Sequence, residues 1–388
     1  GNMVHPYLRR RNGEEKATYA NESVKSVLGR TLGIPIFQEQ VIKLAVVAAG
    51  FTPGEADQLR RAMASWKRKN SLGDFRVKLV NGMLERGHDK SFAERIFEQI
   101  KGFGVYGFPE SHAASFALLV YFSAWLKKHE PAAFYCGLLN SQPMGFYSPS
   151  QLLQDAKRHD IEVRPVDIMN SHWESTLEVA HYKNEVTARQ PAIRLGLQRI
   201  KGLKENSVTR IIHERNQHNI KNIKDIAKRA RLDSGDLTKL TEGGAFKSIA
   251  GNRYQTHWQV SGLLPPTPLL EEEFHVVKPK KKYATEKHQE ETPVILPAPL
   301  ESDNLRADYA SLGLTLGRHP MALLREKPDT PFRQCKTANE LKALNHGRFV
   351  QISGIVTGRQ RPSSASGVLF LTLEDETDNI NVVVWTRV

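Results

Sequence analysis

The run from Ala113 to Leu126, in which nearly every residue is apolar or aromatic, limits the fold of this chain more than any other feature. Pro109 and Ser111 precede it as residues typical of a helix start, and Pro131 follows it as a stop signal. A helix that is apolar all round is a buried helix, and the run is shorter than the roughly 20 residues that a membrane-spanning helix needs. We therefore expect a core helix with Ser111 as its N-cap.

His112 lies in the first turn of this expected helix. Unpaired backbone N–H groups and the positive end of the helix dipole favour an anion at such a place. His112 is therefore a candidate ligand-side residue. The alternative is that it only caps or packs at the helix entrance, because helix starts are common and ligand sites are few.

The cations of the chain outnumber its anions, with 55 Lys and Arg against 42 Asp and Glu and a formal net charge of +13. The excess is concentrated in residues 60–78 and 183–262. Two basic clusters in one chain favour a nucleic-acid partner, whereas a single one is usually a solvated face. In the first cluster we take Lys67, Arg68 and Lys69 as candidate DNA-binding residues.

The two cysteines, Cys136 and Cys335, form no CxxC pattern, so that neither a disulfide framework nor a zinc site is indicated. Such a chain fits a reducing compartment. The sequence contains no signal peptide and no transmembrane segment, and we expect a cytoplasmic protein without a membrane partner.

Two segments place a glycine turn between two short helices, which is the helix-hairpin-helix pattern. In "IRLGLQRIKGLKENSVTRIIHERNQ" we expect a helix, the turn and a second helix; "LTKLTEGGAFKSIAGNRYQTHW" repeats the pattern. Glycine allows a tight turn, so that backbone N–H groups at the start of the next helix can meet a phosphate oxygen. The candidate DNA-binding residues here are Lys201, Gly202, Lys204, Gly243, Gly244, Lys247 and Arg253.

Three strand-like runs, "RFVQISGIVTGRQ", "GVLFLTLEDE" and "NINVVVWTRV", close the sequence. Three strands cannot close a barrel alone. The loop after the first run carries Arg359 and Arg361 beside flexible residues, as in an oligonucleotide-binding (OB) barrel, and we take both as candidate DNA-binding residues.

These patterns predict a mainly α multidomain fold. A stretch rich in Pro, Glu and Lys after the hairpins is typical of a linker. The expected parts are a helical domain at 1–175, a tandem helix-hairpin-helix region at 176–262, the linker at 263–304, a connecting helical segment at 305–348 and a truncated OB-fold β-barrel at 349–388.

Several long blocks resemble the bacterial DNA polymerase III alpha subunit family: "GNMVHPYLRRRNG", "LGIPIFQEQV", "ADQLRRAM", "YGFPESHAASFALLVY", "LLNSQPMGFYSP", "LGLTLGRHP" and "SGIVTGRQRP". Within the fourth and fifth of these blocks, "FPESHAASFALLVY" and "LLNSQPMGFYSP" are similar to the error-prone, ImuC-type branch of the family. The resemblance implies that 1–175 is a fingers domain of a DNA-directed DNA polymerase used in damage-induced translesion synthesis. In the family a palm, which holds catalytic aspartates and Mg²⁺, precedes the fingers, so the resemblance implies no catalytic or metal-binding residue in this chain, which alone would be inactive.

The fingers of this family face the incoming nucleotide, which implies a role for four residues. Arg60 and Arg61 could fork onto triphosphate oxygens, although a solvated helix face is the alternative. Tyr106 could pack on a base or sugar, and His112 could lie by the nascent pair.

The resemblance also implies partners: primer-template DNA, an incoming dNTP and the accessory proteins ImuA and ImuB. The segment "QVSGLL" at 259–264 lacks the aromatic ending of a clamp-binding peptide, which favours indirect contact with the sliding clamp. Three alternatives stay open: a replicative alpha subunit, a non-enzymatic scaffold of hairpin and OB modules, and a hairpin-containing base-excision enzyme. The last needs a catalytic carboxylate after the hairpin, and Asp225 and Asp233 look like ordinary surface carboxylates.

Overall fold

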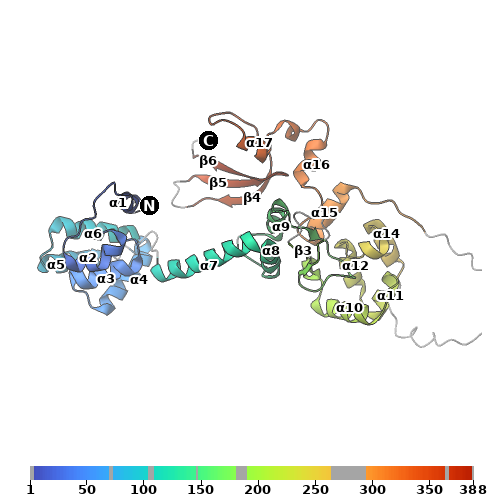
Figure 1. Cartoon of the computed structure of the whole chain (residues 1–388), viewed down its shortest axis with the longest axis horizontal. Helices are drawn as coiled ribbons and strands as arrows, with labels where there is room; N and C mark the ends of the chain where they lie inside the picture. The colour runs from blue at the N-terminus through green and yellow to red at the C-terminus, as the bar shows by residue number, and fades with distance from the viewer. Residues whose placement is uncertain are drawn as a thin grey trace, which may run out of the picture. The chain divides into compact units, whose positions relative to one another are not determined.

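The computed structural model describes residues 4–69, 73–103, 109–145, 147–180, 190–263, 294–362 and 367–386 (Figure 1). The chain forms two compact units, Gly1–Trp125 and Leu126–Val388. Tyr106 lies outside the described residues, as do the side chains of Lys67, Arg68 and Lys69. The predicted fold class, mainly α with a small C-terminal sheet, is confirmed.

The first unit is a set of helices around one apolar core. They are α1 (Val4–Arg11), α2 (Glu22–Leu28), η1 (Gly29–Thr31), α3 (Gln38–Ala49), α4 (Pro53–Lys69), α5 (Gly73–Glu85), α6 (Lys90–Phe103) and the start of α7 (Glu110–His129). α3 packs against α2, α4 and α5, and its Val41 and Leu44 are buried. Gly50 ends α3 with a φ of 73°, a conformation that glycine adopts without strain.

The apolar run forms α7, but the expectation that it is a buried core helix is wrong for the described part of the chain. None of the α7 side chains is buried, and Phe116, Tyr121 and Trp125 are 51%, 66% and 47% exposed. A uniformly apolar pattern indicates that every face suits an apolar neighbour, but it does not identify that neighbour. No described helix is long and apolar enough to cross a membrane.

The helical part of the second unit carries a small three-stranded sheet. Its elements are α8 (Pro131–Asn140), α9 (Pro149–Arg158), β1 (Val163–Arg164), β2 (Thr176–Glu178), β3 (Ala192–Arg194), η3 (Leu197–Arg199), α10 (Glu205–Gln217), α11 (Ile223–Arg229), α12 (Ser234–Glu242), α13 (Lys247–Ala250), α14 (Arg253–Ser261) and α15 (Glu301–Ser311). One core runs from Tyr135 of α8 through Ile193 of β3 to Phe246. The expected domain boundary at residue 175 therefore falls inside a continuous core.

The helix expected before the first glycine turn is wrong. Residues 192–194 form β3, which pairs in parallel with β1 and antiparallel with β2, and only the short 3₁₀ turn η3 follows. Ile193 lies in register with both Val163 and Leu177, so that strand pairing outcompetes a local helix. Short apolar runs do not distinguish strand from helix by periodicity alone.

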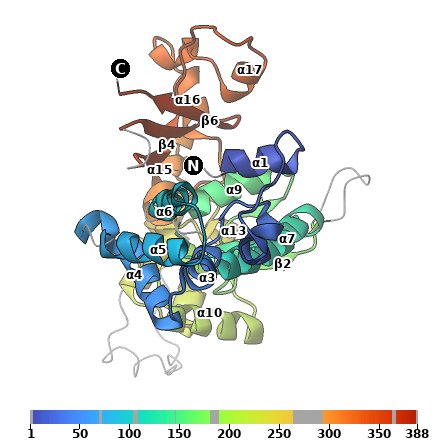
Figure 2. The ribbon, with the colours of Figure 1, turned by 90° about the vertical axis from the view of Figure 1, so that its left-hand side faces the viewer.

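The C-terminal part is an antiparallel sheet in the order β4-β5-β6, as the three strand-like runs predict. Its strands are β4 (Ile355–Gln360), β5 (Leu369–Glu374) and β6 (Asn379–Val384), and they are preceded by α16 (Pro320–Glu326), η5 (Pro331–Gln334) and α17 (Ala338–Lys342). Figure 2 shows α16 beside this sheet. Asp375, which follows β5, joins α17 to the sheet, because its Oδ2 accepts the N–H of Ala338 in the first turn of α17 at 2.7 Å.

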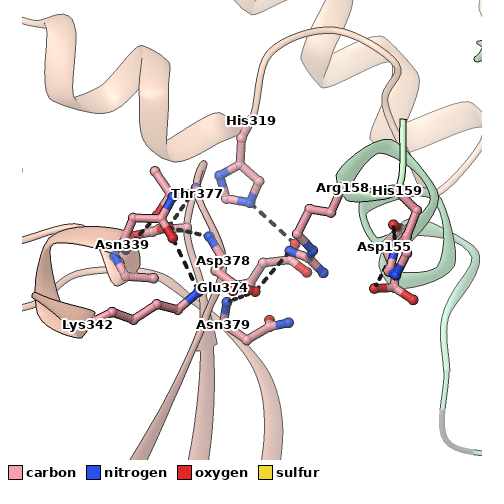
Figure 3. A network of polar contacts seen from close by, with 12 residues as sticks. Asp155, Arg158, His159, His319, Asn339, Lys342, Glu374, Thr377, Asp378 and Asn379 are labelled. Carbon is pink, nitrogen blue, oxygen red and sulfur yellow. Dashed lines mark hydrogen bonds and ion pairs between the residues drawn. The ribbon is translucent and has the colours of Figure 1, made fainter. Parts of the chain in front are cut away.

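A polar network holds this sheet against the helical part of the same unit (Figure 3). Asp378, in the β5–β6 turn, accepts the ammonium of Lys342 at 2.5 Å and lies 3.6 Å from the guanidinium of Arg158 on α9. His319 Nδ1 accepts the N–H of Met321, which places its ring proton on Nε2, 3.3 Å from Glu374. The sheet is therefore tied to α9 and to the segment before α16.

Candidate nucleic-acid interface

Arg60 and Arg61 share one carboxylate. Their Nε atoms each lie 2.9 Å from a different oxygen of Asp57, one turn earlier on α4. Hydrogen bonding from Arg60, aided by the charge of both arginines, holds the pKa of Asp57 below its usual value against the opposing effect of desolvation. The cluster keeps one excess positive charge, which suits a polyphosphate.

The start of α7 already holds an anion from within the chain. The N–H of Glu110 donates to both carboxylate oxygens of Glu39, at 3.0 and 2.8 Å. Burial raises the pKa of Glu39, but these backbone hydrogen bonds outweigh it and leave the pKa below its usual value. The helix-start anion site predicted beside His112 is therefore filled by Glu39.

His112 is exposed, and its ring centroid lies 4.3 Å from that of Phe116. α7 begins at Glu110, so the predicted N-cap Ser111 lies inside the first turn, and that prediction is wrong. His112 is thus an exposed ring in the first turn of α7. Its position does not require it to cap the helix, because Glu39 already accepts a backbone N–H there.

The first hairpin turn leaves the start of α10 uncapped by a side chain. Gly202 has a φ of 75°, and Lys204 is the N-cap residue but provides no side-chain hydrogen bond. α11, α12 and α14 differ, because Asn222, Asp233 and Asn252 each accept a first-turn N–H with their side chains, whereas the four-residue helix α13 also lacks a side-chain cap. The first-turn N–H groups of α10 can therefore receive an external oxygen, as the hairpin pattern requires.

Lys201 does not point its charge at an external anion. Its Nζ donates to the carbonyl oxygens of Tyr309 at 3.2 Å and Ala310 at 2.8 Å, and its N–H donates to Ser311 at 2.9 Å. These are the last carbonyl groups of α15, which a cation stabilises. The contacts give Lys201 a structural role at the end of α15.

The second hairpin turn is mostly internal. Gly243 is buried, and a Cβ atom there would lie 2.9 Å from the Ile200 side chain. Arg253 donates to the carbonyl of Glu242 at 3.1 Å, to Asn304 Oδ1 at 2.9 Å and to Asp308 at 2.5 Å. We therefore assign Gly243 and Arg253 to bracing the fold, while Lys247 is exposed on α13.

Gly244 and the two OB arginines complete the predicted set. Gly244 has a φ of 72° beside the Arg253 guanidinium. Arg359 is exposed on β4 in register with Leu371, and Arg361 is exposed at the start of the following loop, where its Nε donates to Gly367 at 3.3 Å. Both arginines are open to solvent at one end of the sheet.

Two family models match the chain. Residues 1–87 match the bacterial DNA polymerase III alpha subunit finger domain, and residues 160–256 match the helix-hairpin-helix motif. The chain is 54%, 53% and 51% identical to proteins called error-prone DNA polymerase from Alkalilimnicola ehrlichii, Teredinibacter turnerae and Pseudomonas aeruginosa. Each alignment covers 99% of this chain and 35% of the relative, so the chain spans about a third of their length.

Residues 1–87 therefore form a domain of the bacterial DNA polymerase III alpha subunit finger family, and the chain as a whole is similar to error-prone DNA polymerases. The alpha subunit finger match covers α1 to α5, and the hairpin match runs from the residues before β1 into α14. Arg60 and Arg61 lie inside the finger match, whereas His112 lies beyond it.

DNA polymerases generally depend on divalent metal ions. Among the described residues, no group of three or more His, Cys, Asp or Glu side chains could hold such an ion. The described residues therefore do not fit a Mg²⁺ site of this kind.

The sequence analysis did not identify three residues that shape this candidate interface. Asp57 lies three and four residues before the two arginines, a helical spacing that does predict ion pairs. Glu39 is 71 residues from Glu110 and has no such signal. Lys239 comes from α12 to lie beside Gly202, and tertiary packing alone brings it there.

Proposed function

We propose that this chain is the nucleotide- and DNA-gripping portion of an error-prone, translesion DNA-directed DNA polymerase. One combination carries the proposal: a finger-domain match with a paired arginine cluster, followed by a hairpin whose second helix lacks a side-chain cap. The fingers would position the nucleotide and the hairpin would hold the DNA backbone without reading its sequence.

In this proposal Arg60 and Arg61 bind the triphosphate of the incoming dNTP, and Asp57 holds them in place. We propose that His112 faces the nascent pair; Tyr106, a candidate for the same role from the sequence, lies outside the described residues. The palm, outside this chain, would hold the Mg²⁺ that stabilises charge during phosphoryl transfer.

Primer-template DNA is the macromolecular partner that we propose, with Gly202, Lys204, Lys247, Arg359 and Arg361 among its contacts. We propose ImuA and ImuB as accessory partners, an indirect link to the sliding clamp and a cytoplasmic location. These three points rest on the family resemblance and the sequence.

Primer extension and DNA binding by the purified 388-residue chain test the proposal. We expect binding of primer-template DNA whose affinity falls as salt rises, through counterion release, and no extension without the palm. Metal-dependent extension by this chain, or salt-independent binding, would contradict it. The scaffold alternative predicts the same binding, but no change in nucleotide use when Arg60 or Arg61 is replaced in the full-length protein.

A further inference from the structure

We propose that Lys239, rather than Lys201, is the cation that binds a DNA backbone phosphate at the first hairpin turn. The inference rests on the proposed DNA-binding function. It assigns Lys239, which belongs to the second hairpin, to the phosphate site of the first.

Lys239 is in the last turn of α12, and its side chain lies against the first hairpin turn. A Cβ atom at Gly202 would be 3.4 Å from its Cε and 3.9 Å from its Nζ. The aliphatic stem thus packs on the exposed turn and carries the ammonium group beside the residues that precede α10. In the described part of the chain, no hydrogen bond or ion pair joins this ammonium to another residue.

The packing of the two hairpins fixes this position. Gly243, at the end of α12, lies so close to Ile200 that a Cβ atom would be 2.9 Å from that side chain. The N–H of Gly243 also donates to the Lys239 carbonyl at 2.8 Å. A side chain at Gly243 would force either Ile200 or α12 to shift, so the glycine permits the close approach that keeps Lys239 beside Gly202.

The charged side chains around the turn differ in whether other residues of the chain already bind them. Asp236, one turn before Lys239, is buried and accepts the Ser207 hydroxyl at 2.6 Å. Glu205 is exposed in the first turn of α10, and Arg210 donates to Ser207 at 3.2 Å. The Lys239 ammonium adds a mobile cation to the uncapped N–H groups of α10, whereas the Lys201 ammonium is held by α15 carbonyls.

A phosphodiester is the ligand that this arrangement suits. It offers two acceptor oxygens, one for backbone N–H groups at the helix start and one for an ammonium group. The contact would add affinity that is independent of base sequence and sensitive to salt.

Three matched variants of the intact protein test the assignment: Lys239→Met, Lys201→Met and Lys228→Met. Methionine keeps the apolar stem and removes the charge, and Lys228 is an exposed lysine on α11. The measurements are the salt dependence of binding to a fluorescent primer-template duplex and a melting curve for each variant.

We expect Lys239→Met to reduce the slope of log affinity against log salt by about one, equally for duplexes of different sequence. Lys201→Met should lower the melting temperature and leave the slope unchanged, and Lys228→Met should change neither. If Lys239→Met has a lowered melting temperature, two further variants decide the matter. Lys239→Arg, which keeps the charge, must retain the wild-type slope, and Lys239→Gln, which removes it, must show the slope reduced by about one.

A reduced salt slope in Lys201→Met together with the wild-type slope in Lys239→Met would overturn the assignment while leaving the proposed function intact. A wild-type protein that binds the duplex without salt dependence would overturn the proposed function itself.

Discussion

At the scale of single residues, the arginine pair on α4 shows how one carboxylate sets the direction of two cations. Adjacent helix positions project about 100° apart. Asp57 nevertheless receives the Nε of both arginines at 2.9 Å, which draws the guanidinium groups to one side of the helix. A preorganised pair loses less freedom when it binds a triphosphate than two independent side chains would.

Replacing Arg60 or Arg61 by Ala in the full-length polymerase should mainly weaken nucleotide use. Loss of one charge-assisted contact costs about 1.5–3 kcal/mol, or roughly 10- to 150-fold in kcat/KM. Steady-state kinetics with varied dNTP measure this effect, and Lys43→Ala, an exposed cation on α3, is the control. A loss of DNA affinity with unchanged nucleotide KM would show that the arginines serve another role.

Glu39→Gln should lower the free energy of unfolding at pH 7 by about 1 kcal/mol, the usual effect of losing a helix N-cap. The folded-state pKa of Glu39 is depressed, so its stabilisation is present above the unfolded value near 4.3 and is lost as pH falls through the folded pKa. The difference in melting temperature between variant and wild type should therefore shrink as pH is lowered from 7 to below 4. A difference that stays constant over this range would argue against an ionised cap.

His112→Ala separates the two roles left open for this residue. Because Glu39 already occupies the start of α7, we expect little change in melting temperature. If His112 faces the nascent pair, nucleotide KM rises by less than for Arg61→Ala. A melting temperature lowered with kinetics unchanged would support the capping role instead.

At the scale of elements, the first hairpin depends on the backbone conformation of one glycine. The φ of 75° at Gly202 is one that residues with a Cβ atom adopt at a cost of roughly 1–2 kcal/mol. An Ala side chain would meet Lys239 only at ordinary contact distance, so the cost lies in the turn itself.

Gly202→Ala should therefore weaken binding to primer-template DNA more than Lys281→Gln, which removes only a diffuse charge from the linker. Gly347→Ala is the matched control, because Gly347 has a φ of 85° and open space around it. Equal losses of DNA affinity in Gly202→Ala and Gly347→Ala would indicate that the hairpin turn has only a structural role.

Local patterns predicted the elements whose partners are close in sequence. The sheet β4-β5-β6 follows from the alternation of apolar and polar residues, because strands that are neighbours in the sequence pair with one another. The strand β3 was predicted as a helix, because its pairing with β1 joins distant segments. The same reason explains why Lys201 was assigned to DNA binding. Its position beside Gly202 indicated a DNA contact, but its actual partner, the end of α15, is 109 residues away in the sequence and is brought to it only by the fold.

At the scale of the whole molecule, the chain divides near residue 125, and each unit carries one of the proposed tasks. The arginine cluster belongs to the first unit and the hairpin to the second. The continuous core from α8 to α14 means that the hairpins are built on the helices before them rather than forming a separate module.

This division predicts that nucleotide and DNA binding respond independently to mutation. In the full-length polymerase, Arg61→Ala should raise nucleotide KM, Gly202→Ala should raise the Kd for primer-template DNA, and the double variant should show both effects. Substitutions that share no contact partner usually have additive free-energy changes, within about 0.5 kcal/mol. Because the two lie in different compact units, we expect this double-mutant cycle in kcat/KM to close within that margin. A larger coupling free energy would mean that DNA held by the hairpin changes how the fingers bind the nucleotide, and the two tasks could then not be assigned to separate units.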